Sequence, residues 1–134
     1  MQPRILYVED DLESRDIMRV LVNEVMGITD LEIFEDSSNF MDRIEAIPFK
    51  PTIILLDIHV APITGFEMLK LIRNHDRFNY VPVVAITASV MNEEIQMLKD
   101  AGFDGVMAKP LDMDRFPILI DKVMNGQSVW TIVE

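Results

Sequence analysis

The chain has 134 residues, 49% of them hydrophobic, which suits one compact domain with a single core and excludes an intrinsically disordered protein. It has no cysteine, no apolar run as long as the ~20 residues of a membrane span and no signal-peptide pattern, so we expect a cytoplasmic protein without disulfides, thiolate metal sites or membrane contacts. The formal net charge of −11 disfavours direct binding of nucleic acid and favours proteins or cations as partners, although solubility alone would also explain it.

The first half of the chain predicts two strands, each followed by a helix. Residues 4–8 form a short, β-rich apolar run, and residues 31–34 form a weaker one. After the first run, large apolar residues recur at every fourth position from Ile17 to Val25, which is typical of a helix with one apolar face. After the second run, residues 37–47 carry the least regular helical pattern.

The second half predicts three more strands and three more helices. The strands are apolar runs at residues 53–56, 81–86 and 106–108, and runs this short and continuous are typical of parallel strands buried on both faces. The helices follow from apolar residues at helical spacing: Phe66, Leu69 and Ile72, then Met91, Ile95 and Leu98, and finally Phe116, Leu119, Ile120 and Val123.

Glycines and one proline predict helix boundaries. Three helices are each followed by a residue suited to the left-handed conformation at a helix C-terminus: Gly27, Gly102 and Gly126. Pro117 fits only the first turn of the last helix, so we expect that helix to begin near Arg115 with Asp114 as its N-cap.

A strand followed by a helix, repeated five times, predicts an α/β fold. Right-handed crossovers place the five strands in one doubly wound parallel sheet with helices on both faces. We expect a single domain over residues 1–126 and an apolar C-terminal tail over residues 127–134.

Polar side chains follow four of the five predicted strands. They are acids after the first and third strands, a hydroxyl after the fourth and an amine after the fifth: Glu9, Asp10, Asp57, Thr87 and Lys109. Because ligands of an open parallel sheet bind at the carboxyl ends of its strands, we expect these side chains to meet in one pocket.

Three carboxylates in one pocket repel each other and need a cation. Oxygen ligands and too few histidines for zinc (His59 and His75) favour a hard ion, and sparse carboxylates with room for water favour Mg²⁺ over Ca²⁺. A metal beside Asp57 would align this weak nucleophile with a phosphoryl group, whose other oxygens an amine and a hydroxyl could hold.

Each of these residues, taken singly, also has a structural explanation. An acidic cluster after a strand often caps the next helix, and we expect Asp11 to do so. For Glu9 and Asp10, helix capping and metal binding are equally good explanations. Thr87 would also suit an ordinary strand end, and Lys109 an ordinary surface position.

Several short motifs occur in a fixed order. They are Ile-Leu-Tyr-Val-Glu-Asp-Asp at residues 5–11, Ile-Leu-Leu-Asp at 54–57, Gly65, Val-Val-Ala-Ile-Thr-Ala at 83–88, Ala-Gly at 101–102 and Lys-Pro at 109–110. In these motifs the chain resembles the receiver domains of two-component response regulators, of the chemotaxis-regulator type. The resemblance extends over about the first 125 residues and is specific because every motif occurs in its place.

The resemblance implies the flavodoxin-like strand order 2-1-3-4-5 and a magnesium-dependent phosphorylation site. Asp57 would accept a phosphoryl group from a sensor histidine kinase or a phosphotransfer protein. Mg²⁺ would be bound by Asp57 and Asp10 directly, by Glu9 mostly through water and by the backbone carbonyl of His59.

The resemblance also implies how the phosphoryl group acts. Thr87 would hydrogen-bond its oxygens, and Lys109, preceding a cis bond to Pro110, would pair with Asp57 and then with its phosphate. The protein would be a switch that catalyses only its own phosphorylation and dephosphorylation. No output domain follows in the sequence, so we expect it to contact a separate effector, its kinase or a second copy in a homodimer.

Three positions depart from the family pattern. Val106 stands where the family usually has an aromatic switch residue, so the output surface is expected to change differently or less. Residues 60–64 replace the usual Met-Pro turn, which puts the position of the His59 carbonyl in question. His59 and Ser89 flank the site where the family tunes the hydrolysis rate, and that rate does not follow from the sequence.

Residues 129–133 are apolar and largely β-branched, which suits either a frayed end or a segment that docks on a sheet edge, a helix or a second copy.

For the whole chain, a haloacid-dehalogenase-like phosphatase is an alternative, but His59 stands where that family has its second aspartate. A nucleotide-binding domain is disfavoured because no glycine-rich loop follows the first strand. A receiver-like adaptor that is never phosphorylated is favoured only by Val106.

Overall fold

The structure, a computed structural model, describes residues 2–130. The strands are β1 (Ile5–Val8), β2 (Leu31–Phe34), β3 (Ile53–Asp57), β4 (Val83–Thr87) and β5 (Gly105–Ala108). The helices are α1 (Leu12–Arg19), which continues as a π-helix η1 (Val20–Val25), α2 (Phe40–Glu45), α3 (Gly65–Arg73), α4 (Asn92–Ala101) and α5 (Phe116–Met124). Within residues 2–130, no helix has both the length and the apolar character needed to cross a bilayer.

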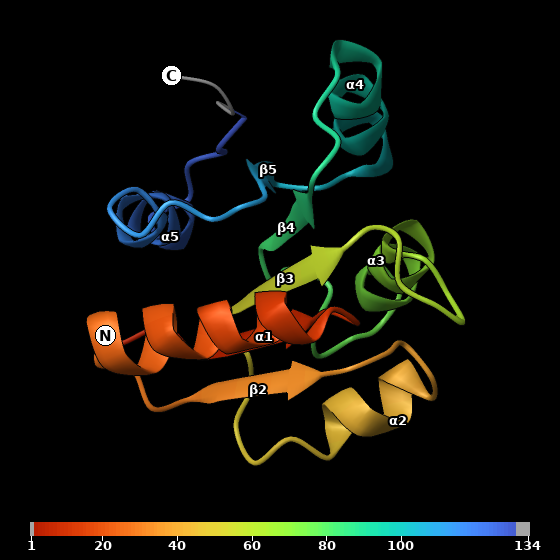
Figure 1. Ribbon diagram of the computed structural model, residues 1–134. Coiled ribbons are helices and arrows are strands. Elements are labelled where there is room, and N and C mark those ends of the chain that lie inside the picture. Colours follow the sequence, from red (N-terminus) through yellow and green to blue (C-terminus); the bar gives the residue numbers. More distant parts are fainter. Residues whose placement is uncertain (1, 131–134) are drawn as a thin grey trace.

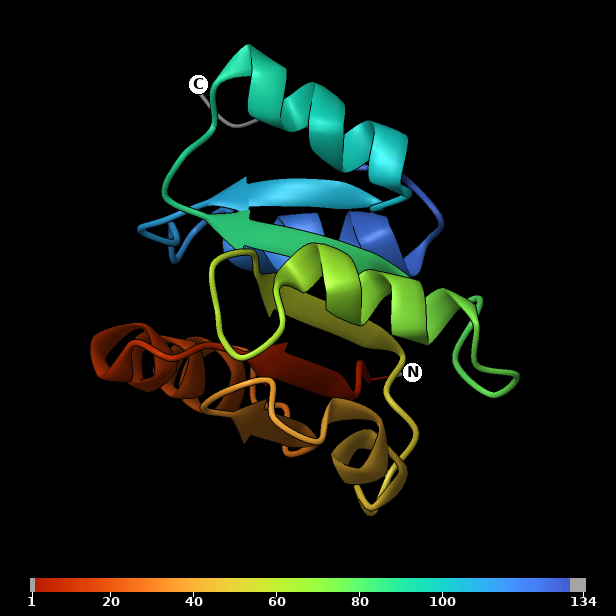
Figure 2. The same ribbon diagram turned by 90° about the vertical axis from the view of Figure 1, so that its right-hand side faces the viewer.

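All five strands lie in one parallel sheet of order β2-β1-β3-β4-β5 (Figure 1), which confirms the predicted doubly wound α/β fold. Figure 2 shows helices on both sides of this sheet. In β1, Ile5 and Tyr7 face α1 and α5, whereas Leu6 and Val8 face α2, α3 and α4, because successive side chains of a strand point to opposite faces. Both faces are therefore covered, which explains the continuous apolar runs in the sequence.

The register of the sheet aligns the carboxyl ends of its central strands. Val8 pairs with Leu56, so the residue after β1 lies next to the end of β3. Thr87 at the end of β4 pairs with Ala108 at the end of β5. The side chains that follow these ends therefore emerge along one edge of the sheet, which is the edge where the sequence predicts a site.

Two elements begin at least two residues later than the sequence predicts. The helix expected over residues 37–47 begins only at Phe40, because Ser37 is used elsewhere: its hydroxyl donates to the carbonyl of Ile63 at 2.6 Å and accepts the N–H of the same residue at 2.8 Å. The strand expected from residue 81 begins at Val83, because Pro82 has no N–H to donate to the sheet.

The predicted caps and apolar faces of the helices are partly wrong. Asp114 does not cap α5: the N-cap position is Arg115, and Asp112 Oδ1 accepts the N–H groups of residues 114 and 115 at 2.8 and 3.1 Å in the turn before the helix. Val25 and Met91 are 50% and 66% exposed, because a strict four-residue spacing drifts off the buried face of a helix and Met91 precedes the first turn of α4. The three glycines do follow helices with positive φ, as expected.

The tail docks on the edge of the sheet as far as the structure describes it. Val129 forms a parallel bridge with Gly105, its carbonyl accepts the N–H of Val106 at 2.8 Å, and its side chain is buried. Trp130 packs on the core beneath α4, with Lys99 Nζ 5.3 Å from the centre of its ring. Of the two alternatives, the frayed end therefore does not apply to these two residues, while residues 131–134 of the predicted tail lie outside the described range.

Gly105→Ala is expected to displace the tail, because a Cβ at this position would lie 2.6 Å from both Cγ2 and the carbonyl oxygen of Val129. We expect the free energy of unfolding in urea to fall by about 1–3 kcal/mol, as for other overpacked sites. The control is the same substitution in a chain that ends at Gln127, where it should have little effect. An equal loss in both chains would contradict the docked tail.

Candidate functional site

The carboxyl ends of β1, β3 and β5 bring two acids and one lysine together. Lys109 Nζ lies 2.7 Å from Glu9 Oε1 and 3.6 Å from Asp57 Oδ2. The side chains of Glu9 and Asp57 are 0% and 7% exposed, and that of Lys109 is 21% exposed. Since water screens buried charges poorly, this attraction is stronger than that of a surface ion pair.

Asp57 is held at the end of β3 with its two carboxylate oxygens in different surroundings. Oδ1 accepts the backbone N–H of His59 at 3.1 Å, whereas Oδ2 faces Lys109. The chain turns closely around this position: a Cβ on Gly65 at the start of α3 would lie 2.9 Å from Ile58 Cδ1 and 3.2 Å from the carbonyl oxygen of Asp57. Only glycine therefore lets α3 approach the loop that follows Asp57.

Glu9 is fully buried and its carboxylate is hydrogen-bonded on both oxygens. Oε1 accepts from the hydroxyl of Tyr7 at 2.6 Å and from Lys109 at 2.7 Å, and Oε2 accepts the N–H of Asp11 at 3.2 Å. Burial and the neighbouring Asp57 raise the pKa of Glu9, while the bonds from Lys109 and Tyr7 oppose that rise.

The same contacts shift the titration of the two partners of Glu9. Burial alone would lower the pKa of Lys109, but the hydrogen bond with Glu9 and the charges of Asp57 and Glu9 outweigh it, so the pKa of Lys109 is raised. Burial, followed by the hydrogen bond to Glu9, raises the pKa of Tyr7 far above that of a free phenol. Tyr7 therefore stays a neutral hydrogen-bond donor and Lys109 a cation at neutral pH.

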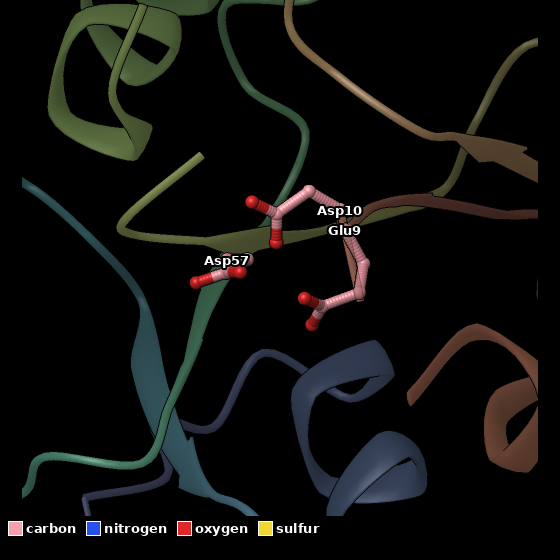
Figure 3. Close-up of side chains that lie close together, drawn as sticks. All are labelled: Glu9, Asp10 and Asp57. Carbon is pink, nitrogen blue, oxygen red and sulfur yellow. The ribbon is translucent and has the colours of Figure 1, made fainter. Parts of the chain in front are cut away.

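Three carboxylates converge where the sequence predicts a metal. Carboxylate oxygens of Glu9, Asp10 and Asp57 lie within 4.8 Å of one another (Figure 3). Figure 3 also shows Glu9 and Asp10 leaving the chain in opposite directions, as neighbours on an extended backbone do. Asp10 is exposed and makes no hydrogen bond or ion pair with any residue in the range 2–130. An all-oxygen cluster with an exposed carboxylate that has no other partner in the described range fits a hard cation such as Mg²⁺.

The structure separates the capping acid from the acids of the site. Asp11 caps α1, since its Oδ2 accepts the N–H of Ser14 at 2.9 Å. Neither Glu9 nor Asp10 serves as that cap, which removes the structural alternative for this pair. Thr87, the last residue of β4, is buried at the same edge, and its Oγ1 accepts the N–H of Ser89 at 3.1 Å.

The loops around the site contain one expected and one unexpected feature. The Lys109-Pro110 bond is cis, as the resemblance implies, and so is Ala61-Pro62 in the loop that departs from the family pattern. Sequence reasoning missed Tyr7 as part of the site, because it treated this residue only as a strand position. The spacing could have revealed it: residues two apart on a strand share a face, and a buried tyrosine hydroxyl needs a polar partner such as Glu9.

The chain belongs to the response regulator receiver domain family, whose model matches residues 5–121. Receiver domains are the phosphorylation switches of two-component signalling. The family resemblance predicted from the motifs is thereby confirmed, and the phosphatase and adaptor alternatives are not favoured.

Curated relatives and solved structures agree with this assignment. The polar-differentiation response regulator DivK of Brucella anthropi is 26% identical over 117 residues, covering 87% of this chain and 91% of that protein. The chemotaxis protein CheY4 of Vibrio cholerae is 21% identical with a TM-score of 0.80, covering 92% of this chain and 99% of that one. The receiver domain of the sensor histidine kinase PA1611 of Pseudomonas aeruginosa, whose structure has a magnesium ion coordinated in the active site cleft, is 19% identical with a TM-score of 0.79, covering 93% and 99%.

Asp11→Ala is expected to destabilise the protein in a pH-dependent way. Hydrogen bonds from the hydroxyl and N–H of Ser14 hold the pKa of Asp11 below its ordinary value. A carboxyl whose pKa is lowered by folding contributes stability above its unfolded pKa and loses it as the pH falls through its folded pKa.

The difference in urea midpoint between wild type and Asp11→Ala should therefore be full at pH 7 and shrink below about pH 4. Glu24→Ala is the control, since Glu24 is exposed and makes no ion pair in the described chain. A difference between wild type and Asp11→Ala that persists unchanged at pH 3 would contradict the cap.

Proposed function

We propose that Asp57 accepts a phosphoryl group from a histidine kinase or a phosphotransfer protein, with Mg²⁺ bound beside it, and that the phosphorylated chain signals through altered protein contacts. The observation that carries this proposal is the position of Lys109, whose ammonium group lies between Glu9 and Asp57 at the carboxyl edge of the sheet. A cation next to a buried carboxylate can stabilise the charge on a phosphoryl group that is transferred to that carboxylate.

The step itself forms one bond and breaks one. An oxygen of Asp57 attacks the phosphorus, the bond from phosphorus to the donor's imidazole nitrogen breaks, and the imidazole keeps the electron pair and takes up a proton. Lys109, 3.6 Å from Oδ2, would neutralise the phosphoryl oxygens, and the Thr87 hydroxyl at the end of the neighbouring strand would hydrogen-bond them. Hydrolysis of the acyl phosphate then returns the carboxylate, so the chain catalyses only its own phosphorylation and dephosphorylation.

Asp10 and Asp57 are the residues that would hold Mg²⁺, with Glu9 acting through water and the backbone carbonyl of His59 as a further ligand. Support comes from the cluster of carboxylate oxygens within 4.8 Å and from the magnesium ion in the cleft of the PA1611 receiver domain. When bound, the ion neutralises charge on the carboxylates and on the incoming phosphoryl group.

The output would pass through the face formed by α4, β5 and α5. Phosphorylation adds about −1.5 to −2 charges at Asp57, which draws Lys109 and Thr87 inward and biases the loops that lead to this face. Val106 of β5 is fully buried, and its N–H donates to Val129, so the strand that precedes Lys109 also carries the tail. Residues 1–126 would act as the receiver and residues 127–134 as its tail, in a cytoplasmic protein whose partners are a kinase and a protein effector, with a homodimer as an alternative.

The test of this proposal is phosphorylation by a small donor. Incubation with acetyl phosphate and Mg²⁺ should add one acid-stable, base-labile phosphate, detected by intact mass spectrometry, and removal of Mg²⁺ by a chelator should abolish it. Asp57→Asn should carry no adduct. Asp76→Asn, which alters an exposed aspartate away from the site, should be phosphorylated as wild type is.

Repeated turnover of phosphate esters without a stable adduct would instead indicate a phosphatase. No adduct in the wild type would indicate an adaptor that is not phosphorylated.

A further inference from the structure

Tyr7 is a buried side chain whose single polar atom is committed to the proposed site. Its ring is fully buried in the layer between the sheet and helices α1 and α5, together with Met18 and Phe116. Its hydroxyl donates to Glu9 Oε1 at 2.6 Å. Because close packing fixes the ring, the hydroxyl is a rigidly placed donor rather than a mobile one.

Oε1 of Glu9 is shared between two donors of different kind. Lys109 reaches it at 2.7 Å with a charge on a flexible side chain, and Tyr7 reaches it at 2.6 Å with a neutral hydroxyl on a rigid ring. The third donor to Glu9, the N–H of Asp11 at 3.2 Å, is held by the backbone and approaches the other oxygen. Of these three donors, Lys109 is therefore the one that can move away from the carboxylate.

Lys109 lies closer to Glu9 than to Asp57, at 2.7 Å against 3.6 Å. Added negative charge on a phosphorylated Asp57 shifts this balance toward Asp57. Glu9 is then left buried without its cation, and a buried carboxylate that loses a partner is strongly destabilising unless other hydrogen bonds remain. Tyr7 and the N–H of Asp11 are the donors that remain.

We propose that Tyr7 is a positioning residue of the phosphorylation site: its hydroxyl fixes the carboxylate of Glu9 and keeps it hydrogen-bonded when Lys109 turns toward the phosphorylated Asp57. This inference rests on the proposed function. Tyr7 would thus take part in the movement of Lys109 from Glu9 to Asp57, although its hydroxyl is hydrogen-bonded to Glu9 and not to Asp57.

Tyr7→Phe tests the inference, because it removes the hydroxyl and keeps the ring. The maximal rate of phosphorylation by acetyl phosphate at saturating Mg²⁺ should fall about tenfold, since a hydrogen bond to a charged group is worth about 1.5–3 kcal/mol and part of it is lost when Lys109 moves. The KM for acetyl phosphate and the dissociation constant of Mg²⁺, measured by calorimetry without a phosphodonor, should change less than twofold, because Lys109 and the N–H of Asp11 still hold Glu9 in the unphosphorylated protein. Tyr80→Phe is the matched control, since Tyr80 is 69% exposed and its hydroxyl contacts Lys50, away from the site.

A double-mutant cycle separates positioning from packing. In a Glu9→Gln background, Tyr7→Phe should cause no further decrease in rate, because the hydroxyl acts only through the charge of Glu9. An unchanged rate in Tyr7→Phe, or an equal decrease with and without Glu9→Gln, would overturn the inference.

If the substituted chain does not fold, NMR of the wild type tests the inference instead. The resonance of the Tyr7 hydroxyl proton should shift on phosphorylation, and an unshifted resonance would overturn the inference. A wild type that forms no adduct on Asp57 would instead remove the proposed function, and this inference with it.

Discussion

Lys109 places one ammonium group between two buried carboxylates, Glu9 and Asp57, at the carboxyl edge of the sheet. Without it, two like charges would repel each other in a pocket where both carboxylates are buried. With it, a cation lies beside Asp57, and Glu9 anchors the lysine. The proposed chemistry, the predicted cation site and the role of Tyr7 all depend on this arrangement.

The fold supplies this arrangement through register. Parallel pairing brings the ends of β1, β3, β4 and β5 to one edge, so residues that are 100 positions apart in sequence come into hydrogen-bonding distance. β5 also pairs with the tail, because the N–H of Val106 donates a hydrogen bond to the carbonyl of Val129. The strand that leads to Lys109 is thus paired with β4 on one side and with the tail on the other.

The sequence predicts the features that depend on hydrophobic periodicity and on the order of the motifs. It predicts less well the features that depend on side-chain geometry. The two-sided sheet and the meeting of Asp57 with Lys109 follow from five short apolar runs and the polar residues after four of them, whereas the strand order follows from the family resemblance. The start of α2 could not be predicted, because Ser37 is held by Ile63 in a distant loop. The use of Asp112 rather than Asp114 in the turn before α5 depends on the direction of one short side chain, and nearby acids fit the pattern equally well. Tyr7 was overlooked for a related reason: its hydroxyl is significant only because Glu9 turns inward.

The coupling between Glu9 and Lys109 tests the central claim most directly. It can be measured from the free energies of unfolding in urea of the wild type, Glu9→Gln, Lys109→Met and the double variant at neutral pH without Mg²⁺. A buried pair 2.7 Å apart predicts that the two losses are not additive, with a favourable interaction energy of about 1–3 kcal/mol. Additive losses would show that Lys109 does not pair with Glu9 in solution, and would contradict a site organised around this lysine.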